Sequence, residues 1–136
     1  MDYIDTNVIL CFLNENDANH DKAVKLWEIK ESKVASEITL LEIRSVLSRK
    51  ANLKEAEIEA YIEYLPEIDV RIVEIDLNRV FNRSMEIAYK TRMKTLDVLH
   101  ISACLEINAS NFVTLDYEFV EKSKFITELG LTIVSA

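Results

Sequence analysis

The sequence predicts an α/β domain in which a mainly parallel β-sheet is flanked by helices. Five short runs of β-type residues alternate with segments whose apolar residues recur at helical spacing, which is the pattern of strand–helix–strand units. The 136-residue length is sufficient for one domain with a sizeable core. The sequence contains no internal repeat, low-complexity tract or linker, so residues 1–136 are expected to form a single domain.

The predicted strands are short runs of apolar and β-branched residues set off by polar or turn-forming neighbours. The first strand ends where Asp5 begins a polar triplet, and the last strand follows Gly130, the single glycine of the chain. The third strand approaches an alternation of apolar and charged residues, as a half-exposed strand does. In chain order, the predicted strands cover residues 3–4, 33–36, 70–75, 112–114 and 131–134.

The predicted helices carry apolar residues at helical spacing. Thr39 and Glu42 match a capping box, so the third helix is predicted to begin at Thr39, and Pro66 ends the fourth helix. The helix that begins at Asp97 is so apolar that it must be packed on most of its sides. In chain order, the predicted helices cover residues 8–13, a segment from a cap at Asp17 or Asn19 to about Lys30, 39–50, 55–65, 76 or 77 to about 93, and 97–107.

The composition indicates a globular protein without membrane-spanning segments, because 49% of the residues are hydrophobic, 29% are charged and the longest apolar runs are too short. The N-terminal segment MDYIDTNVIL has acids where a signal peptide has basic residues, so a cytoplasmic protein is expected. Cys11 and Cys104 are expected to be buried thiols. The net charge of −8 argues against a protein that coats nucleic acid, and one glycine is too few for a glycine-rich phosphate loop.

Four acids occupy comparable positions at the predicted strand ends and helix starts. Asp5 follows the first strand and Asp116 follows the fourth, while Glu42 and Asp97 lie in the first turns of their helices. Each acid alone is explained by a helix cap, an Asx turn or attraction to a helix dipole. In a parallel sheet, however, strand ends and the following helix starts lie at one edge. The four acids are therefore expected to converge there.

Converging carboxylates raise one another's pKa unless a cation compensates their charge. Carboxylate oxygens are ligands that suit Mg²⁺ or Mn²⁺, which often bind substrate phosphates as well. The sequence therefore predicts a divalent-metal site at the sheet edge.

The order of these segments resembles the PIN domain family, and within it the small VapC-type toxin ribonucleases. The resemblance is carried by YIDTNVIL, SEITLLEIRSVLSRK, TLDVLHISACLEINASNFVTLDYEF and the closing LTIV, which together span nearly the whole chain. It implies a three-layer fold with a central five-stranded parallel sheet, an RNA substrate, a cognate antitoxin partner and a homodimer. The implied catalytic and metal-binding residues are Asp5, Glu42, Asp97 and Asp116, supported by the polar residues Thr6, Asn7 and Thr114.

The reaction implied by this resemblance is hydrolysis of RNA phosphodiester bonds. Bound Mg²⁺ or Mn²⁺ would lower the pKa of a water, orient it for in-line attack and stabilise charge on the phosphoryl oxygens. Asp5, Asp97 and Asp116 are expected to be the main ligands. Glu42 would complete the metal shell or position the water.

Several other residues have weaker functional interpretations. Arg49 shares a helix face with Glu42 and could contact a phosphate, although a surface arginine explains it equally well. Residues 79–94 contain five basic residues and one acid, so a possible RNA contact there competes with a simple solvated face. The candidates in that segment are Arg79, Arg83 and Lys90. His100 could hydrogen-bond an acid, but an ordinary core histidine is the favoured interpretation.

Three alternative functions use the same acidic edge. A PIN-like module could bind without catalysis, and a housekeeping PIN ribonuclease would act without an antitoxin. A receiver-like regulatory domain would accept a phosphoryl group and is expected to have paired acids early in the chain and a lysine after a late strand. The late strand here ends in Thr114-Leu115-Asp116 instead, which counts against the receiver.

Overall fold

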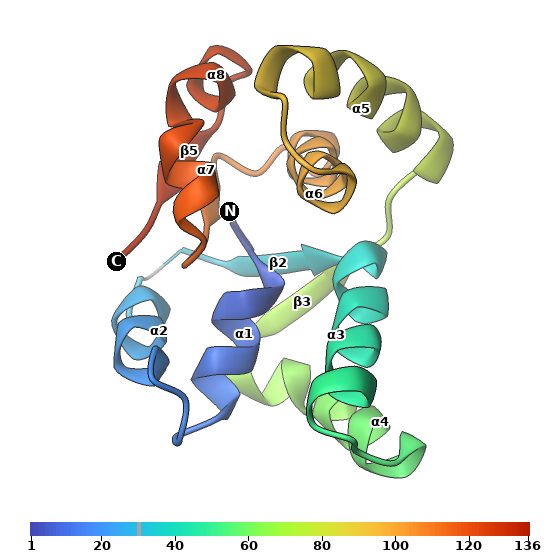
Figure 1. Ribbon diagram of the computed structural model, residues 1–136, viewed down its shortest axis with the longest axis vertical. Helices are drawn as coiled ribbons and strands as arrows, with labels where there is room; N and C mark the ends of the chain where they lie inside the picture. The colour runs from blue at the N-terminus through green and yellow to red at the C-terminus, as the bar shows by residue number, and fades with distance from the viewer. Residues whose placement is uncertain (30) are drawn as a thin grey trace.

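The computed structural model describes residues 1–29 and 31–136 and confirms the predicted fold class. Its five strands form one sheet in the order β3-β2-β1-β4-β5, and all neighbouring strands are parallel. Figure 1 shows β2 and β3 side by side in this sheet. The strands are β1 (Asp2–Ile4), β2 (Lys33–Ser36), β3 (Val70–Val73), β4 (Asn111–Val113) and β5 (Thr132–Val134). Each strand begins and ends within two residues of its predicted bounds.

The helices follow the predicted order, with two additions near the C-terminus. They are α1 (Thr6–Leu13), α2 (His20–Trp27), α3 (Glu37–Lys50), α4 (Glu55–Tyr64), the 3-10 turn η1 (Leu65–Ile68), α5 (Leu77–Thr91), α6 (Thr95–Glu106), α7 (Tyr117–Glu121) and α8 (Ser123–Glu128). The predicted end of the second helix at Lys30 lies outside the described residues. None of the described helices is both long and apolar enough to cross a membrane.

Helices α7 and α8 were not predicted because five and six residues are too short to establish a helical period. Tertiary packing stabilises them instead, since Phe119 and Ile126 are buried against the sheet core.

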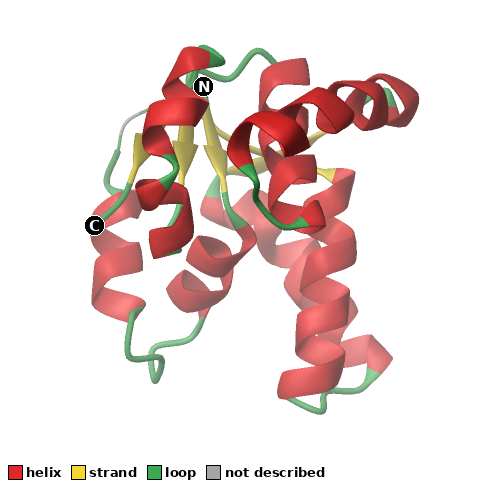
Figure 2. Ribbon diagram, turned by 45° about the horizontal axis from the view of Figure 1, so that its top comes forward, coloured by secondary structure: helices red, strands yellow, loops and turns green. Residues whose placement is uncertain are grey.

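Alternate residues of the central strands divide between two cores, one on each face of the sheet. Tyr3 and Phe112 pack with α5, α6, α7 and α8 on one face. Ile4 and Val113, their neighbours in sequence, pack with α1, α2, α3 and α4 on the other. Figure 2 shows the sheet between these two helix layers, which is the expected three-layer architecture.

The start of α3 corrects the predicted capping box. Helix α3 begins at Glu37, and the Ser36 backbone N–H donates to Thr39 Oγ1 at 3.3 Å. Thr39 therefore caps the helix from inside its first turn, while Glu42 lies in the second turn and takes no part in the cap. The carboxylate of Glu42 is left available for the sheet edge.

Candidate functional site

The strand order reverses between β1 and β4, and this reversal positions the first acid of the site. Successive strands are added on one side of β1 as β2 and β3, and on the other side as β4 and β5, so the carboxyl ends of β1 and β4 form the switch point at which parallel sheets bind ligands. Asp5 follows β1 at this switch point and is 6% exposed. Its Oδ1 accepts from the Thr6 backbone N–H at 2.9 Å, and its Oδ2 accepts from Thr114 Oγ1 at 2.7 Å.

The four predicted acids converge at this edge as two adjoining groups. Asp5 and Glu42 form the first group together with His100, and Asp97 and Asp116 form the second together with Glu118. Within each group, potential ligand atoms lie within 4.8 Å of one another. The charges of Asp116 and Asp5 both act on Asp97, which links the two groups electrostatically.

Glu118 was not among the predicted site residues. It lies in the first turn of α7, two residues after Asp116. The position of Glu118 two residues after Asp116 could have indicated its place in the site, but the helix α7 that brings it there was not predicted.

The structural roles considered for single acids also occur in the structure. Asp5 is the N-cap of α1, and Asp116 is the N-cap of α7, where its Oδ1 accepts from the Glu118 backbone N–H at 3.0 Å. Asp97 lies in the first turn of α6. These caps fix the direction in which each carboxylate points, so a capping role and a site role are compatible.

The electrostatics of the acids differ between the two groups. Burial, reinforced by the charge of Glu42, raises the pKa of Asp5 to about 6, although His100 and Thr114 oppose this. Burial and the charges of neighbouring acids raise the pKa of Asp97 to about 6. Burial also acts to raise the pKa of Glu42, but the hydrogen bond and charge of His100 and the nearby Thr6 hydroxyl lower it overall.

Across residues 1–29 and 31–136, no lysine or arginine forms an ion pair with any of these five carboxylates. Much of their mutual repulsion is therefore left without a protein cation to balance it. A divalent cation would supply the missing positive charge.

The polar residues around the acids fit such a cation. Thr6 Oγ1 is buried close to Glu42, whose pKa it helps to lower, but it has no partner at hydrogen-bond geometry among residues 1–29 and 31–136. Thr114 Oγ1 accepts from the Asp116 backbone N–H at 2.9 Å while it donates to Asp5. Asn7 Oδ1 accepts from the Leu115 backbone N–H at 3.3 Å and ties α1 to the end of β4. The resulting oxygen-rich donor set suits Mg²⁺ or Mn²⁺.

A PIN domain family model matches residues 3–124. The chain belongs to the PIN domain family. No protein of curated function matches it in sequence.

Solved structures share the fold of this PIN domain over most of its length. VapC20 from Mycobacterium tuberculosis is 16% identical with a TM-score of 0.73, and all of both chains is covered. FitAcB from Neisseria gonorrhoeae is 18% identical with a TM-score of 0.70, covering 99% of this chain and 97% of that one. A toxin–antitoxin complex from Klebsiella pneumoniae is 19% identical with a TM-score of 0.60, covering 88% and 90%.

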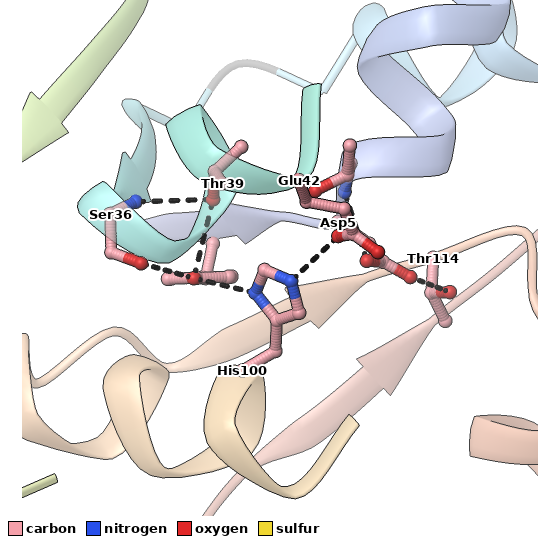
Figure 3. Close-up of polar contacts among 8 residues, drawn as sticks. Asp5, Ser36, Thr39, Glu42, His100 and Thr114 are labelled. Atoms are coloured by element: carbon pink, nitrogen blue, oxygen red, sulfur yellow. Dashed lines mark hydrogen bonds and ion pairs between the residues drawn. The ribbon is translucent and has the colours of Figure 1, made fainter. Parts of the chain in front are cut away.

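His100 has both of the roles considered for it from sequence. The side chain is 1% exposed, as a core histidine is, and its Nε2 lies 2.8 Å from Glu42 Oε1. Figure 3 shows the ring between Glu42 and the polar residues at the start of α3. The favoured interpretation of an ordinary core histidine was incomplete, because the bond to Glu42 joins α6 to α3 across the site.

A groove of about 600 Å³ leads away from the first acid group of the PIN domain. It begins at Thr6, Asn7 and Glu42 and passes between α1 and α3 toward Lys50 and Tyr61. Glu42 is the member of the first acid group that lines this groove.

The predicted RNA-contact residues lie away from the acid groups. Arg49 is exposed and donates to the Ser45 carbonyl at 3.2 Å, whereas the next residue, Lys50, lines the groove. Arg79 pairs with Glu106 at 3.2 Å. Arg83 and Lys90 line a separate hollow near Asn108, beyond the end of α6 opposite Asp97. Their contact with RNA stays a prediction.

Proposed function

We propose that this PIN domain is a ribonuclease that uses Mg²⁺ or Mn²⁺ to hydrolyse RNA phosphodiester bonds, and that it is the toxin of a VapBC-type toxin–antitoxin pair. The observation that carries the proposal is the convergence of five carboxylates without a balancing lysine or arginine in the described residues. Those carboxylates are Asp5, Glu42, Asp97, Asp116 and Glu118. Membership of the PIN family and the similarity in fold to VapC20, a toxin that cleaves the sarcin–ricin loop, support it.

The residues of the chain have distinct tasks in this proposal. The bound ion would supply a water of lowered pKa and positive charge beside the phosphoryl oxygens. Asp5 is held at both oxygens by Thr6 and Thr114, which prepares it as a ligand of fixed orientation. Glu42 commits Oε1 to His100 and leaves Oε2 to orient the attacking water or to accept its proton.

The second acid group completes the ligand set. Asp97 is presented from the start of α6, and Asp116 and Glu118 from the start of α7. Because the positive ends of these helices face the carboxylates, they favour the ionised forms that a metal requires.

Cleavage of single-stranded and structured RNA by the purified protein tests the proposed activity. We expect cleavage with Mn²⁺ or Mg²⁺, complete loss in EDTA and recovery when excess Mn²⁺ is added back. Cleavage that continues unchanged in EDTA would overturn the metal dependence. Metal binding without cleavage of any RNA would favour the catalytically silent binding module instead.

The antitoxin partner is a further part of the proposal. The similarity in fold to a toxin–antitoxin complex supports it, and the acidic edge is complementary to a partner that presents basic residues. In the same assay, the product of a small adjacent gene is expected to stop cleavage when it is added in equimolar amount. A housekeeping ribonuclease would have no such inhibitor.

An apolar stripe on α5 supports the proposed homodimer. Four large hydrophobic side chains at a spacing of four residues are each at least 41% exposed, and they are Leu77, Phe81, Met85 and Tyr89. Exposed apolar side chains aligned on one helix face mark a protein interface. A second copy of the chain could cover this stripe with its own.

Met85→Glu is expected to weaken the dimer at least tenfold, which is about 1.4 kcal/mol, because it places a charge in the middle of the apolar stripe. Sedimentation velocity over a range of concentrations measures the change. A wild-type protein that is monomeric at every concentration would contradict the dimer, and an unchanged dimer in the variant would place the interface elsewhere.

A further inference from the structure

A chain of buried hydrogen bonds connects the interior of the sheet to Glu42. The hydroxyl of Tyr3 on β1 lies 2.8 Å from Ser36 Oγ and 2.8 Å from His100 Nδ1. The opposite ring nitrogen, His100 Nε2, lies 2.8 Å from Glu42 Oε1 (Figure 3). These hydrogen bonds thus connect β1 through α6 to α3, and the last of them is made with a carboxylate of the proposed metal site.

The protonation of each group determines which atom donates in each of these hydrogen bonds. An ionised Glu42 can only accept, so His100 Nε2 carries the hydrogen. When the ring is neutral, Nδ1 accepts the Tyr3 O–H; when both nitrogens carry hydrogen, Nδ1 donates to the Tyr3 oxygen, and the 2.8 Å contact is kept in both states. Burial raises the pKa of Tyr3 above its ordinary value, which keeps that hydrogen in place. The oxygen of Tyr3 can accept in turn from the Ser36 hydroxyl.

The surrounding core leaves His100 little freedom to rotate. The ring is 1% exposed, and the Tyr3 ring meets it edge-on with centroids 5.8 Å apart. A rotated imidazole would leave two buried nitrogens and the Tyr3 hydroxyl in need of new partners, which is costly. The position of Nε2 is therefore fixed by β1 and α3 as well as by its own helix.

The orientation of the Glu42 carboxylate depends on the His100 donor more than the orientations of the aspartates depend on their backbone N–H donors. A glutamate has one more rotatable bond than an aspartate, and the Glu42 side chain is 20% exposed at the mouth of the site. Asp5 and Asp116 are fixed by nearby backbone N–H groups, whereas Glu42 is held by a side chain from another element.

We propose that His100 positions Glu42 for metal binding and that Tyr3 positions His100, so that the affinity for the divalent ion depends on a buried tyrosine hydroxyl. This inference rests on the proposed metal-dependent function. The competing possibility is that His100 Nε2 leaves Glu42 and ligates the ion directly, since it belongs to the same group of potential ligand atoms.

Calorimetric titration with Mn²⁺ tests the positioning role without an activity measurement. Glu42→Gln and His100→Ala are each expected to weaken Mn²⁺ binding about 10–100-fold, as loss of a group that orients metal ligands does. Tyr3→Phe is expected to weaken it by up to about tenfold, since the ring stays and only the hydroxyl is lost. His100→Gln can place an amide N–H near the position of Nε2, so it is expected to recover most of the affinity.

A double-mutant cycle separates positioning from general destabilisation. In the Glu42→Gln background, Tyr3→Phe is expected to cause no further loss of Mn²⁺ affinity, because its effect acts through Glu42. Ser102→Ala is the matched control, since it also removes one buried hydroxyl of the same core, which donates to the Val80 carbonyl at 2.8 Å. This control is expected to leave Mn²⁺ affinity unchanged.

The outcomes that overturn the inference are distinct from those that overturn the function. Unchanged Mn²⁺ affinity in Tyr3→Phe and His100→Ala, or additive losses in the cycle, would overturn the positioning role alone. Pulsed electron paramagnetic resonance of the Mn²⁺-loaded wild type is expected to show no ¹⁴N coupling from a ligated imidazole, and such a coupling would make His100 a ligand. A wild type that binds no Mn²⁺ would overturn the proposed function and this inference together.

Discussion

Asp97→Asn is expected to lower metal-dependent RNA cleavage by about 10²–10³-fold, equivalent to about 2.7–4 kcal/mol of transition-state stabilisation. The same substitution is expected to make the metal-free protein more stable. Both effects follow from the position of Asp97, whose carboxylate is half-buried and repelled by Asp116, Asp5 and Glu118. The asparagine keeps the shape of the side chain but removes the charge that a metal needs and that the apo fold opposes.

Cleavage rates in Mn²⁺ and thermal unfolding in EDTA measure the two effects of this substitution. Asp76→Asn is the matched control, because Asp76 also lies at a helix start, where its Oδ1 accepts from the Asn78 and Arg79 backbone N–H groups. It belongs to neither acid group, so cleavage is expected to stay at the wild-type rate. If Asp97→Asn lost both activity and stability, Asp97 would be a structural residue.

Divalent metal is expected to stabilise the protein strongly at pH 7.5 and only weakly at pH 5. Asp5 and Asp97 have folded-state pKa values raised to about 6 from an ordinary value of 3.8. Since the folded state then binds their protons more tightly than the unfolded state, the stability of the metal-free protein falls as pH rises from about 4 to about 6. Glu42 has the opposite sign, because its pKa is lowered, but its contribution is lost only as pH falls below about 4.5.

Metal binds the ionised carboxylates, so it competes with protons below pH 6 and reverses the loss of stability above it. At 100 times its dissociation constant, the ion contributes about 2.7 kcal/mol, or a rise of about 10 °C in melting temperature. Thermal unfolding at both pH values with increasing Mn²⁺ measures this rise. The combined variant Asp5→Asn with Asp116→Asn is expected to lose the rise, and an equal rise in that variant would contradict the site.

The sequence predicted the convergence of the acids because their positions depend on topology alone. Once strands alternate with helices in a parallel sheet, residues that follow β1 and β4 must lie at one edge, as Asp5 and Asp116 do. The start of α3 was misplaced because Thr39 matches two capping patterns, and the bond to Ser36 is the one that forms.

The remaining features depend on tertiary contacts that a sequence pattern does not encode. The Tyr3 hydroxyl and His100 are 97 positions apart in the sequence, so no local spacing predicts the hydrogen bond between them. Glu118 enters the site only because packing stabilises the short helix α7. The basic residues of α5 lie near the end of α6 opposite Asp97, where Arg79 pairs with Glu106, and periodicity alone does not give this position.

The pairing of β1 with β4 also determines when the site can form during synthesis. The hydrogen bond from Thr114 to Asp5 spans 109 positions, and β1 can pair with β4 only after residues 111–113 have been made. A ribosome-bound chain that ends before residue 111 has neither the strand beside β1 nor Asp116. Because synthesis proceeds from the N-terminus, the acidic edge stays incomplete until Asp116 and Glu118 have been added.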